Sequence, residues 1–479
     1  AICANQECVL LTNGKTAAVI HFRSSDQIEF LELPVSNNKS LADVVSEKDQ
    51  KVTKKQDKKH EGDRQKRQKE NITEQAQKKD SEERTKSDNH ILACALSSDG
   101  HLIAVCDDRK FLHVYKVEDG RCHIQFSSPL VHRCTSVTVS KDNQHVIVAD
   151  KSGDAYVFNV MEQVKGQVSK NSTDEASLSE VQTTPVECQH EDRNKGGTLL
   201  LGHHSMLIDL LLVDSDTLIV TCDRDEKIRI SHFPDGYNIQ TFCLGHTQFV
   251  ISLAYDDARK ILMSGSGDAT VRLWDLHGHE LHQKNVLPDI PADDSLPSTE
   301  MNEAQTDNPM EVSVGRFQSQ TTIQQISYCS DHQILFVVIY KCPHILAYKL
   351  TDAGDSCRLT TQLISVLKGQ ENVVSICVSY HVLWIVRQGV SRLIVSAYRI
   401  QSEADTVELV PVLEDASNES VAVQTFSKQE VLLEVPPTLL DLMPSLWKPT
   451  FQEDIKYENS VKRLKVESER DQDGKRHKR

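Results

Sequence analysis

A repeat of about 43 residues is the feature that most constrains what this chain can fold into. Strings of similar pattern (AVCDDRKFLHVYKV, VADKSGDAYVFNV, TCDRDEKIRISHF and SGSGDATVRLWDL) end strands near Tyr115, Phe158, Ser231 and Trp274. The first two and the last two are each 43 residues apart, whereas the middle interval is 73 residues. A polar insertion between Met161 and Gly197 accounts for the longer interval. A repeat at this spacing predicts a series of small, similar sheets.

Two of the units align without gaps, which makes the repeat specific. LGHHSMLIDL and LGHTQFVISL are offset by 43 residues, and the same offset aligns Asp225 with Asp268 and Arg229 with Arg272. Short apolar runs alternate with Gly, Asp and Ser, as is typical of strands joined by tight turns. Units of about 40–45 residues with four short strands each are the signature of the WD-repeat β-propeller.

Weaker units extend the repeat in both directions. VLLTNGKTAAVIHF with IEFLEL fits a first blade, IQQISYCSDHQILFVVIY with HILAYKL a sixth, and VVSICVSYHVLWIVRQ with RLIVSAYRI a seventh. We therefore predict an all-β fold, a seven-bladed WD-repeat β-propeller over residues 1–412. Because the ring must close, six or eight blades are the alternatives.

Polar segments are expected to lie outside the ring. Residues 39–89, 161–197 and 287–311 are rich in polar and charged side chains, so we predict disordered inserts there, since such segments cannot offset their ordering entropy. Residues 413–479 form a charged C-terminal extension, which we expect to be partly helical and basic at its end. Lys462, Arg463 and Lys465 are candidates for contact with an RNA backbone, and the terminal KRHKR is compatible with import into the nucleus.

Composition excludes several classes of protein. The formal net charge of -16 argues against a surface that binds nucleic acid throughout, because phosphates require clustered Lys and Arg. The 13 cysteines include no C-x-x-C pair, so we expect free thiols in a reducing compartment and no zinc site. The first residues lack the pattern of a signal peptide, and no apolar stretch approaches the ~20 residues that span a bilayer. We therefore expect a soluble intracellular protein.

Two His–Asp pairs could be mistaken for catalytic pairs. We expect His203 to pair with Asp225, and His246 with Asp268, as buried links inside their blades. Ser264 would extend the second network toward Trp274. The chain lacks the G-x-S-x-G, H-E-x-x-H and P-loop motifs, and it has no Gly-rich turn for a nucleotide or an S-adenosyl cofactor. We therefore predict no catalytic residue, no cofactor and no metal in this chain.

The segment Asp223–Arg229 (DRDEKIR) is far more charged than the matching turn of the next unit, GDATVR. One interpretation is a solvated turn with an ordinary outward Arg229. The other is a docking patch whose ion pairs fix the register of a protein partner. The spacing alone leaves both interpretations open.

A resemblance to a known family favours the second interpretation. VADKSGDAYVFNV, LGHHSMLIDL, TCDRDEKIRI, FCLGHTQFV and SGSGDATVRLWD together resemble the WD-repeat, non-catalytic subunit of the eukaryotic tRNA (guanine-N7-)-methyltransferase. The close match covers about Val148–Leu276, and a fainter one covers Ile91–Val117 and the string SLWKPTFQEDIKYENSVKRLK. The long inserts depart from the family pattern.

The resemblance implies a heterodimer. The catalytic partner would bind S-adenosylmethionine and methylate a guanine in the tRNA variable loop, while this chain would hold that partner in its active conformation and assist tRNA binding. The charged turn would face the partner, with Lys227 paired to a partner carboxylate. The partner-binding candidates are Lys151, Asp223, Arg224, Glu226, Lys227 and Arg229.

Two other classes of propeller are weaker alternatives. A substrate-receptor adaptor of a cullin ubiquitin ligase usually carries W-D-x-R or W-D-x-K, whereas this chain reads Trp274-Asp275-Leu276-His277. A propeller hydrolase would require a nucleophile or a metal cluster, and the sequence shows neither.

Overall fold

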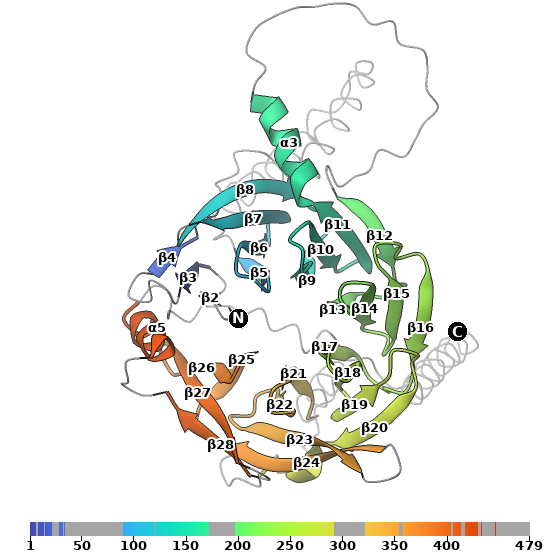
Figure 1. Cartoon of the computed structure of the whole chain (residues 1–479), viewed down its shortest axis with the longest axis vertical. Coiled ribbons are helices and arrows are strands. Elements are labelled where there is room, and N and C mark those ends of the chain that lie inside the picture. Colours follow the sequence, from blue (N-terminus) through green and yellow to red (C-terminus); the bar gives the residue numbers. More distant parts are fainter. Residues whose placement is uncertain are drawn as a thin grey trace, which may run out of the picture. The chain divides into compact units, whose positions relative to one another are not determined.

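The computed structural model describes residues 1–5, 8–13, 15–21, 28–31, 33, 90–118, 120–171, 197–291, 321–353, 358–403, 406–412, 417–429, 433 and 446. Within these residues, seven four-stranded antiparallel sheets follow one another around a ring, as the blades of a propeller (Figure 1). The predicted all-β fold with seven blades is confirmed.

Each blade uses four strands that are consecutive in the chain. The first blade contains β1 (Ile2–Ala4), β2 (Cys8–Thr12), β3 (Ala17–His21) and β4 (Ile28–Phe30). The second contains β5 (Ile91–Leu96), β6 (Leu102–Asp107), β7 (Phe111–Glu118) and β8 (Arg121–Pro129). The third contains β9 (Cys134–Val139), β10 (His145–Asp150), β11 (Asp154–Asn159) and β12 (Thr198–Gly202). The fourth contains β13 (Leu207–Val213), β14 (Leu218–Asp223), β15 (Ile228–His232) and β16 (Ile239–Cys243).

The remaining three blades follow the same order. The fifth contains β17 (Val250–Asp256), β18 (Ile261–Ser266), β19 (Thr270–Trp274) and β20 (Glu280–Asn285). The sixth contains β21 (Ile323–Cys329), β22 (Ile334–Ile339), β23 (Ile345–Ala353) and β24 (Arg358–Leu367). The seventh contains β25 (Asn372–Ser379), β26 (Val382–Gln388), β27 (Leu393–Glu403) and β28 (Thr406–Pro411).

Burial within a blade explains its sequence pattern. All residues of β14 and β18 are buried, because neighbouring blades cover both faces of each sheet. Strands covered on both faces are near-continuous apolar runs, as in LIVTC of β14. The outer strand β20 has no buried residue and is correspondingly polar. Each apolar core therefore lies between two blades, so a blade cannot bury its faces without its neighbours.

One partly buried aspartate links three adjacent blades near the axis. Asp209 on β13 accepts hydrogen bonds from the Ser136 hydroxyl on β9 at 3.0 Å and from the Leu253 amide on β17 at 2.9 Å. It also accepts one from its neighbour Leu210 at 2.9 Å. Burial raises the pKa of this carboxyl to about 6. The innermost strands of the third, fourth and fifth blades are therefore joined by one side chain.

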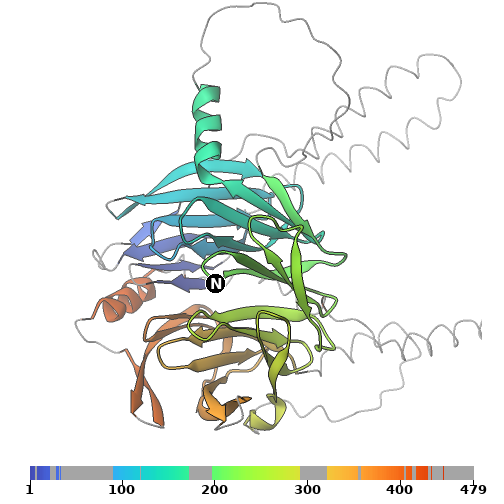
Figure 2. The same cartoon turned by 45° about the vertical axis from the view of Figure 1, so that its right-hand side comes forward.

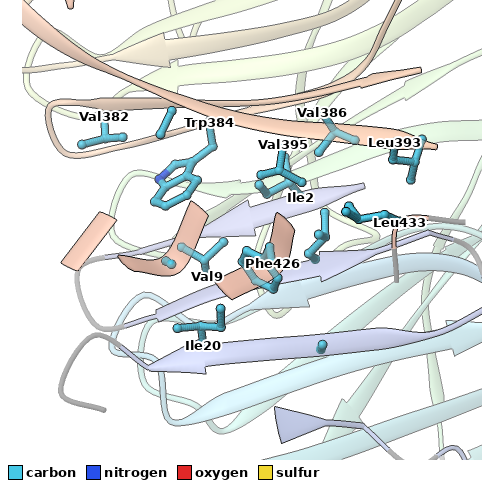
Figure 3. Packing of buried hydrophobic residues seen from close by; sticks show 14 of the residues in the cluster. Ile2, Val9, Ile20, Val382, Trp384, Val386, Leu393, Val395, Phe426 and Leu433 are labelled. Carbon is cyan, nitrogen blue, oxygen red and sulfur yellow. The ribbon is translucent and has the colours of Figure 1, made fainter. Parts of the chain in front are cut away.

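The seam between the first and last blades is closed by side-chain packing. Each of these two sheets is built from its own end of the chain, so no strand is exchanged between them. Val9 of β2 and Trp384 of β26 belong to one buried cluster (Figure 3). Helix α5 (Asn418–Ser427), capped by the Ser417 hydroxyl, adds the fully buried Phe426 to the same cluster.

Two segments expected to be disordered inserts begin with regular structure. Helix α3 (Val160–Asn171) continues directly from β11 and stands out from the ring (Figure 2). Residues Leu287–Asp289 form a short 3-10 helix, η2. The disorder prediction is therefore wrong at these positions, where local helical hydrogen bonding extends the blades. The inserts at 39–89, 172–196 and 292–311 lie outside the described residues. No helix in the described ranges is long and apolar enough to cross a membrane.

Candidate docking surface on the fourth blade

The charged turn between β14 and β15 is organised by the Asp223 carboxylate. Its Oδ1 atom accepts the backbone N–H groups of Asp225 at 2.8 Å and Lys227 at 3.0 Å. The Asp223 amide also donates to the Lys227 carbonyl at 3.1 Å, which closes the turn. Glu226 takes a positive φ of 57°, a conformation that the turn requires. The exposed charges are therefore carried on a tightly held backbone.

The same turn recurs in neighbouring blades, which shows that its backbone belongs to the fold. Asp107 and Asp150 occupy the position of Asp223, and each accepts the amide of the residue four positions later, at 2.8 and 3.1 Å. The residue that takes the place of Glu226 also has a positive φ in the other turns: Lys110 in the second blade, Gly153 in the third and Ala269 in the fifth. The charges on the turn differ between blades: the second-blade turn Asp107–Lys110 is also strongly charged, whereas the matching turns of the third and fifth blades carry fewer charges than that of the fourth.

The His–Asp network of the fifth blade has the expected partners. His246 donates through Nδ1 to Asp268 at 3.0 Å, and its Nε2 lies 2.8 Å from the Ser264 hydroxyl. The Trp274 indole donates to the same hydroxyl at 2.9 Å. Burial opposes ionisation, but the hydrogen bonds from His246 and Thr270 hold the pKa of Asp268 well below its usual range. These groups are buried and mutually engaged, as in a structural link.

In the fourth blade the expected pairing of His203 with Asp225 is wrong. His203 donates through Nδ1 to Asp223 at 2.9 Å, and its Nε2 lies 2.8 Å from the Thr221 hydroxyl. Asp225 instead accepts the Ser205 hydroxyl at 2.6 Å. In the fifth blade the residue aligned with Asp223 is Ser266, which has no carboxylate. Asp268 therefore supplies the carboxylate that pairs with His246 in that blade. A recurring Asp at the start of the turn, as in Asp107 and Asp150, was the sequence signal for this shift.

Arg229 is a buried structural residue, with 8% of its surface exposed. Its Nε donates to the Ser231 hydroxyl at 2.9 Å, and its two terminal nitrogens donate to the carbonyls of Gly202 at 2.9 Å and Gly236 at 3.0 Å. Burial lowers the pKa of this guanidinium from its ordinary value. Arg229 and Asp223, which is 2% exposed, are therefore engaged inside the protein, and we remove both from the candidate docking surface.

The side chains that reach solvent come from two adjacent turns. Lys227 and Lys151 are exposed, and Arg224 and Glu226 are partly exposed. The two turns are connected, because the His203 amide donates to the Gly153 carbonyl at 2.8 Å and the His203 ring holds Asp223. We call Lys151, Arg224, Glu226 and Lys227 the docking turns. They form a preorganised charged surface on the third and fourth blades.

Other expected sites lie elsewhere or outside the described residues. Lys462, Arg463 and Lys465 are not among those residues. Within the part of the chain that the structure describes, no group of three His, Cys, Asp or Glu side chains is arranged to hold a metal ion. The cysteines described there are free thiols.

The chain is similar to one family of proteins over most of its length. The family model described as "tRNA methyltransferase TRM82 WD40 domain" matches residues 13–418. The tRNA (guanine-N(7)-)-methyltransferase non-catalytic subunit wdr4 of Danio rerio is 38% identical over 203 residues, which are 42% of each protein. WDR4 of Homo sapiens, with the same description, is 36% identical over 194 residues, 40% of this chain and 39% of the relative.

A third relative comes from an insect. The non-catalytic subunit wuho of Culex quinquefasciatus is 35% identical over 212 residues, which are 44% of each protein. The chain therefore aligns with less than half the length of each of these relatives.

Proposed function

Because the chain belongs to the tRNA methyltransferase TRM82 WD40 domain family, we propose that it is the non-catalytic subunit of a tRNA (guanine-N7-)-methyltransferase. The observation that carries the proposal is the family match over residues 13–418, which includes the docking turns. The relatives wdr4, WDR4 and wuho are named as non-catalytic subunits of that enzyme. The family match does not support the alternative of a ubiquitin-ligase adaptor.

The docking turns supply the contact with a catalytic subunit in a heterodimer. Lys227 is exposed, and its ammonium group donates to the Asp225 carbonyl at 3.0 Å, within a turn whose backbone is fixed by Asp223. A preorganised cation loses little conformational entropy when it meets a partner carboxylate. The partner would carry the S-adenosylmethionine site and the methyl-transfer chemistry.

Activation follows from binding to one state of the partner. A subunit that binds the active conformation of the enzyme more tightly than the inactive one shifts the population toward the active one. The propeller suits this role because its blades bury one another's faces, so the docking turns keep their spacing while the partner changes. This chain then contributes no reacting group.

Co-expression with a candidate catalytic subunit tests the proposal. We expect the two chains to co-purify in equal amounts, and the complex to methylate tRNA at guanine N7 much faster than the catalytic subunit alone. A control complex with Arg121→Glu, an exposed site on a hairpin of the second blade, should behave as the wild type. Equal activity with and without this chain, or methylation by this chain alone, would contradict the proposal.

We also propose that the basic end of the tail assists tRNA binding, through Lys462, Arg463 and Lys465. The support is the clustering of cations in an otherwise acidic chain, because phosphate contacts draw on local positive charge. Changing all three to Ala should weaken tRNA binding by the complex and reduce its salt dependence, while assembly is unchanged. Unaltered tRNA affinity would remove the tail from the binding surface.

We propose that the protein acts in the nucleus, with the terminal KRHKR as the import signal. A fluorescent fusion should accumulate in nuclei, and replacement of Lys475, Arg476, Lys478 and Arg479 by Ala should redistribute it. A fusion that stays outside nuclei with the intact tail would contradict this location.

A further inference from the structure

The outer strand of the fourth blade exposes large apolar side chains. Along β16 and its flanks, Tyr237 is 81% exposed, Ile239 43%, Phe242 39% and Leu244 65%. Single exposed apolar residues are common on protein surfaces, but apolar side chains gathered on one element mark an interaction site. The strand lies on the outside of the ring (Figure 1), at the edge of its sheet.

The blade geometry does not require these apolar residues. In the fifth blade, strand register places Gln283 opposite Arg272, as Phe242 is placed opposite Arg229. By the same comparison Glu280 takes the position of Ile239. The neighbouring blade therefore presents polar groups at matching places on the same kind of strand. Of these two outer strands, β16 is apolar at the compared positions and β20 is polar.

The strand is held rigidly in place. Gln240 donates to the Leu276 carbonyl at 2.6 Å, and the Thr241 hydroxyl donates to the His277 carbonyl at 3.0 Å, both on the fifth blade. Cys243 is fully buried in the core between these two blades. A surface fixed in this way loses little entropy on binding.

The apolar strand is continuous with the docking turns. Ile228, which follows Lys227, pairs with Cys243, so Leu244 lies at the same end of the blade as Lys227. Phe242 pairs with Arg229, the buried residue that leads out of the charged turn. Phe242 and Leu244 are two residues apart, which places their side chains on one face of an extended chain. A partner that contacts Lys227 can therefore also contact Phe242 and Leu244.

We infer that β16 forms the apolar half of the interface with the catalytic methyltransferase subunit, an inference that rests on the proposed function. Exposed apolar groups beside a fixed cation fit a partner surface with an apolar strip flanked by a carboxylate. Apolar anchors supply most of the affinity of such interfaces, and flanking charges set register and association rate. Phe242 and Leu244 act as the anchors, and Lys227 orients the partner.

Binding measurements on the full chain test this inference. The variants are Leu244→Ser alone and Phe242→Ser with Leu244→Ser, and the dissociation constant for the purified catalytic subunit is measured by fluorescence anisotropy. We expect the double variant to bind at least tenfold more weakly than the wild type, with an unchanged thermal transition. If the double variant is less stable than the wild type, Leu244→Ser alone carries the test, because its site is 65% exposed and the substitution leaves the core intact. The matched control, Gln283→Ser on β20, should bind as the wild type.

The outcomes separate the inference from the proposed function. If the wild type binds and Lys227→Glu does not, but both β16 variants bind normally, the inference fails while the proposed function stands. If the wild type does not bind the catalytic subunit, both fail. Light scattering of the chain alone provides the third outcome. If the wild type is a homodimer and the β16 variants are monomers, the strand binds a second copy of the chain and the inference is overturned.

Discussion

The imidazole of His203 lies against the carboxylate of Asp223, with 2.9 Å between Nδ1 and Oδ2. The other oxygen of that carboxylate accepts the amides of Asp225 and Lys227. A buried histidine on one loop therefore controls the backbone that presents the docking cation. The stability of the blade and the geometry of its charged turn depend on the same carboxylate.

His203→Ala should destabilise the protein and weaken partner binding together. Asp223 loses a buried hydrogen bond, which costs about 1–3 kcal/mol of the free energy of unfolding, and the turn loosens. The matched control is His113→Ala, which removes the buried ring that contacts Asp107 and Ser127 in the second blade, away from the docking turns and β16. Chemical denaturation should show similar losses for both variants, whereas a pull-down should show weaker binding for His203→Ala only. Equal binding by the two variants would separate the turn from the interface.

Lys227→Glu should abolish co-purification with the catalytic subunit while the propeller stays folded. The lysine is exposed, so reversal of its charge places repulsion at the interface without opening the core. Circular dichroism and the thermal transition should match those of the wild type. Retained co-purification would show that the contact lies elsewhere.

Arg229→Ala should lower the free energy of unfolding by about 2–4 kcal/mol, because the buried carbonyl of Gly236 and the partly buried one of Gly202 lose a charged donor. Arg229→Lys should rescue only part of this loss, since one ammonium cannot reproduce three donors in a planar fork. Urea unfolding of the three proteins makes the comparison. Full stability in the lysine variant would mean that charge alone matters at this position.

Asp209 should make the protein less stable as pH rises from 4 to 7. Its pKa in the folded protein is about 6, above the ordinary value, so the folded state must lose a proton that it binds more tightly than the unfolded state. The variant Asp209→Asn does not titrate in this range and serves as the reference. The free energy of unfolding of the wild type, relative to this variant, should fall by about 2 kcal/mol over that range. A constant difference across pH would contradict the raised pKa.

Phe426→Ala should loosen the seam between the first and last blades. The ring is fully buried among residues of both blades, and its removal from α5 should cost about 3–5 kcal/mol. Hydrogen exchange should increase first in β2 and β26. Val423→Ala on the same helix removes a partly buried side chain and should cost less. Exchange confined to α5 would show that the helix does not hold the seam.

The sequence by itself predicted a propeller and the course of its clearest blades, with seven as the preferred number and six or eight as alternatives. These follow from the 43-residue repeat and from apolar runs such as LIVTC, because each blade is a local unit whose pattern reflects burial on both faces. The charged turn that carries Lys227 could be located in the repeat as well, but its role as a partner contact came from the family resemblance.

Only the tertiary structure decided which groups meet. The 43-residue alignment places Asp225 opposite Asp268, yet His203 contacts Asp223, since the fourth blade has a carboxylate where the fifth has Ser266. One interpretation of the sequence had Arg229 facing outward, but its hydrogen bonds to the carbonyls of Gly202 and Gly236 hold it inside. Which hydrogen-bond partners form depends on differences of roughly a few tenths of an ångström in donor–acceptor distance between loops of different strands. A sequence alignment contains the order of the residues but not the distances between their atoms.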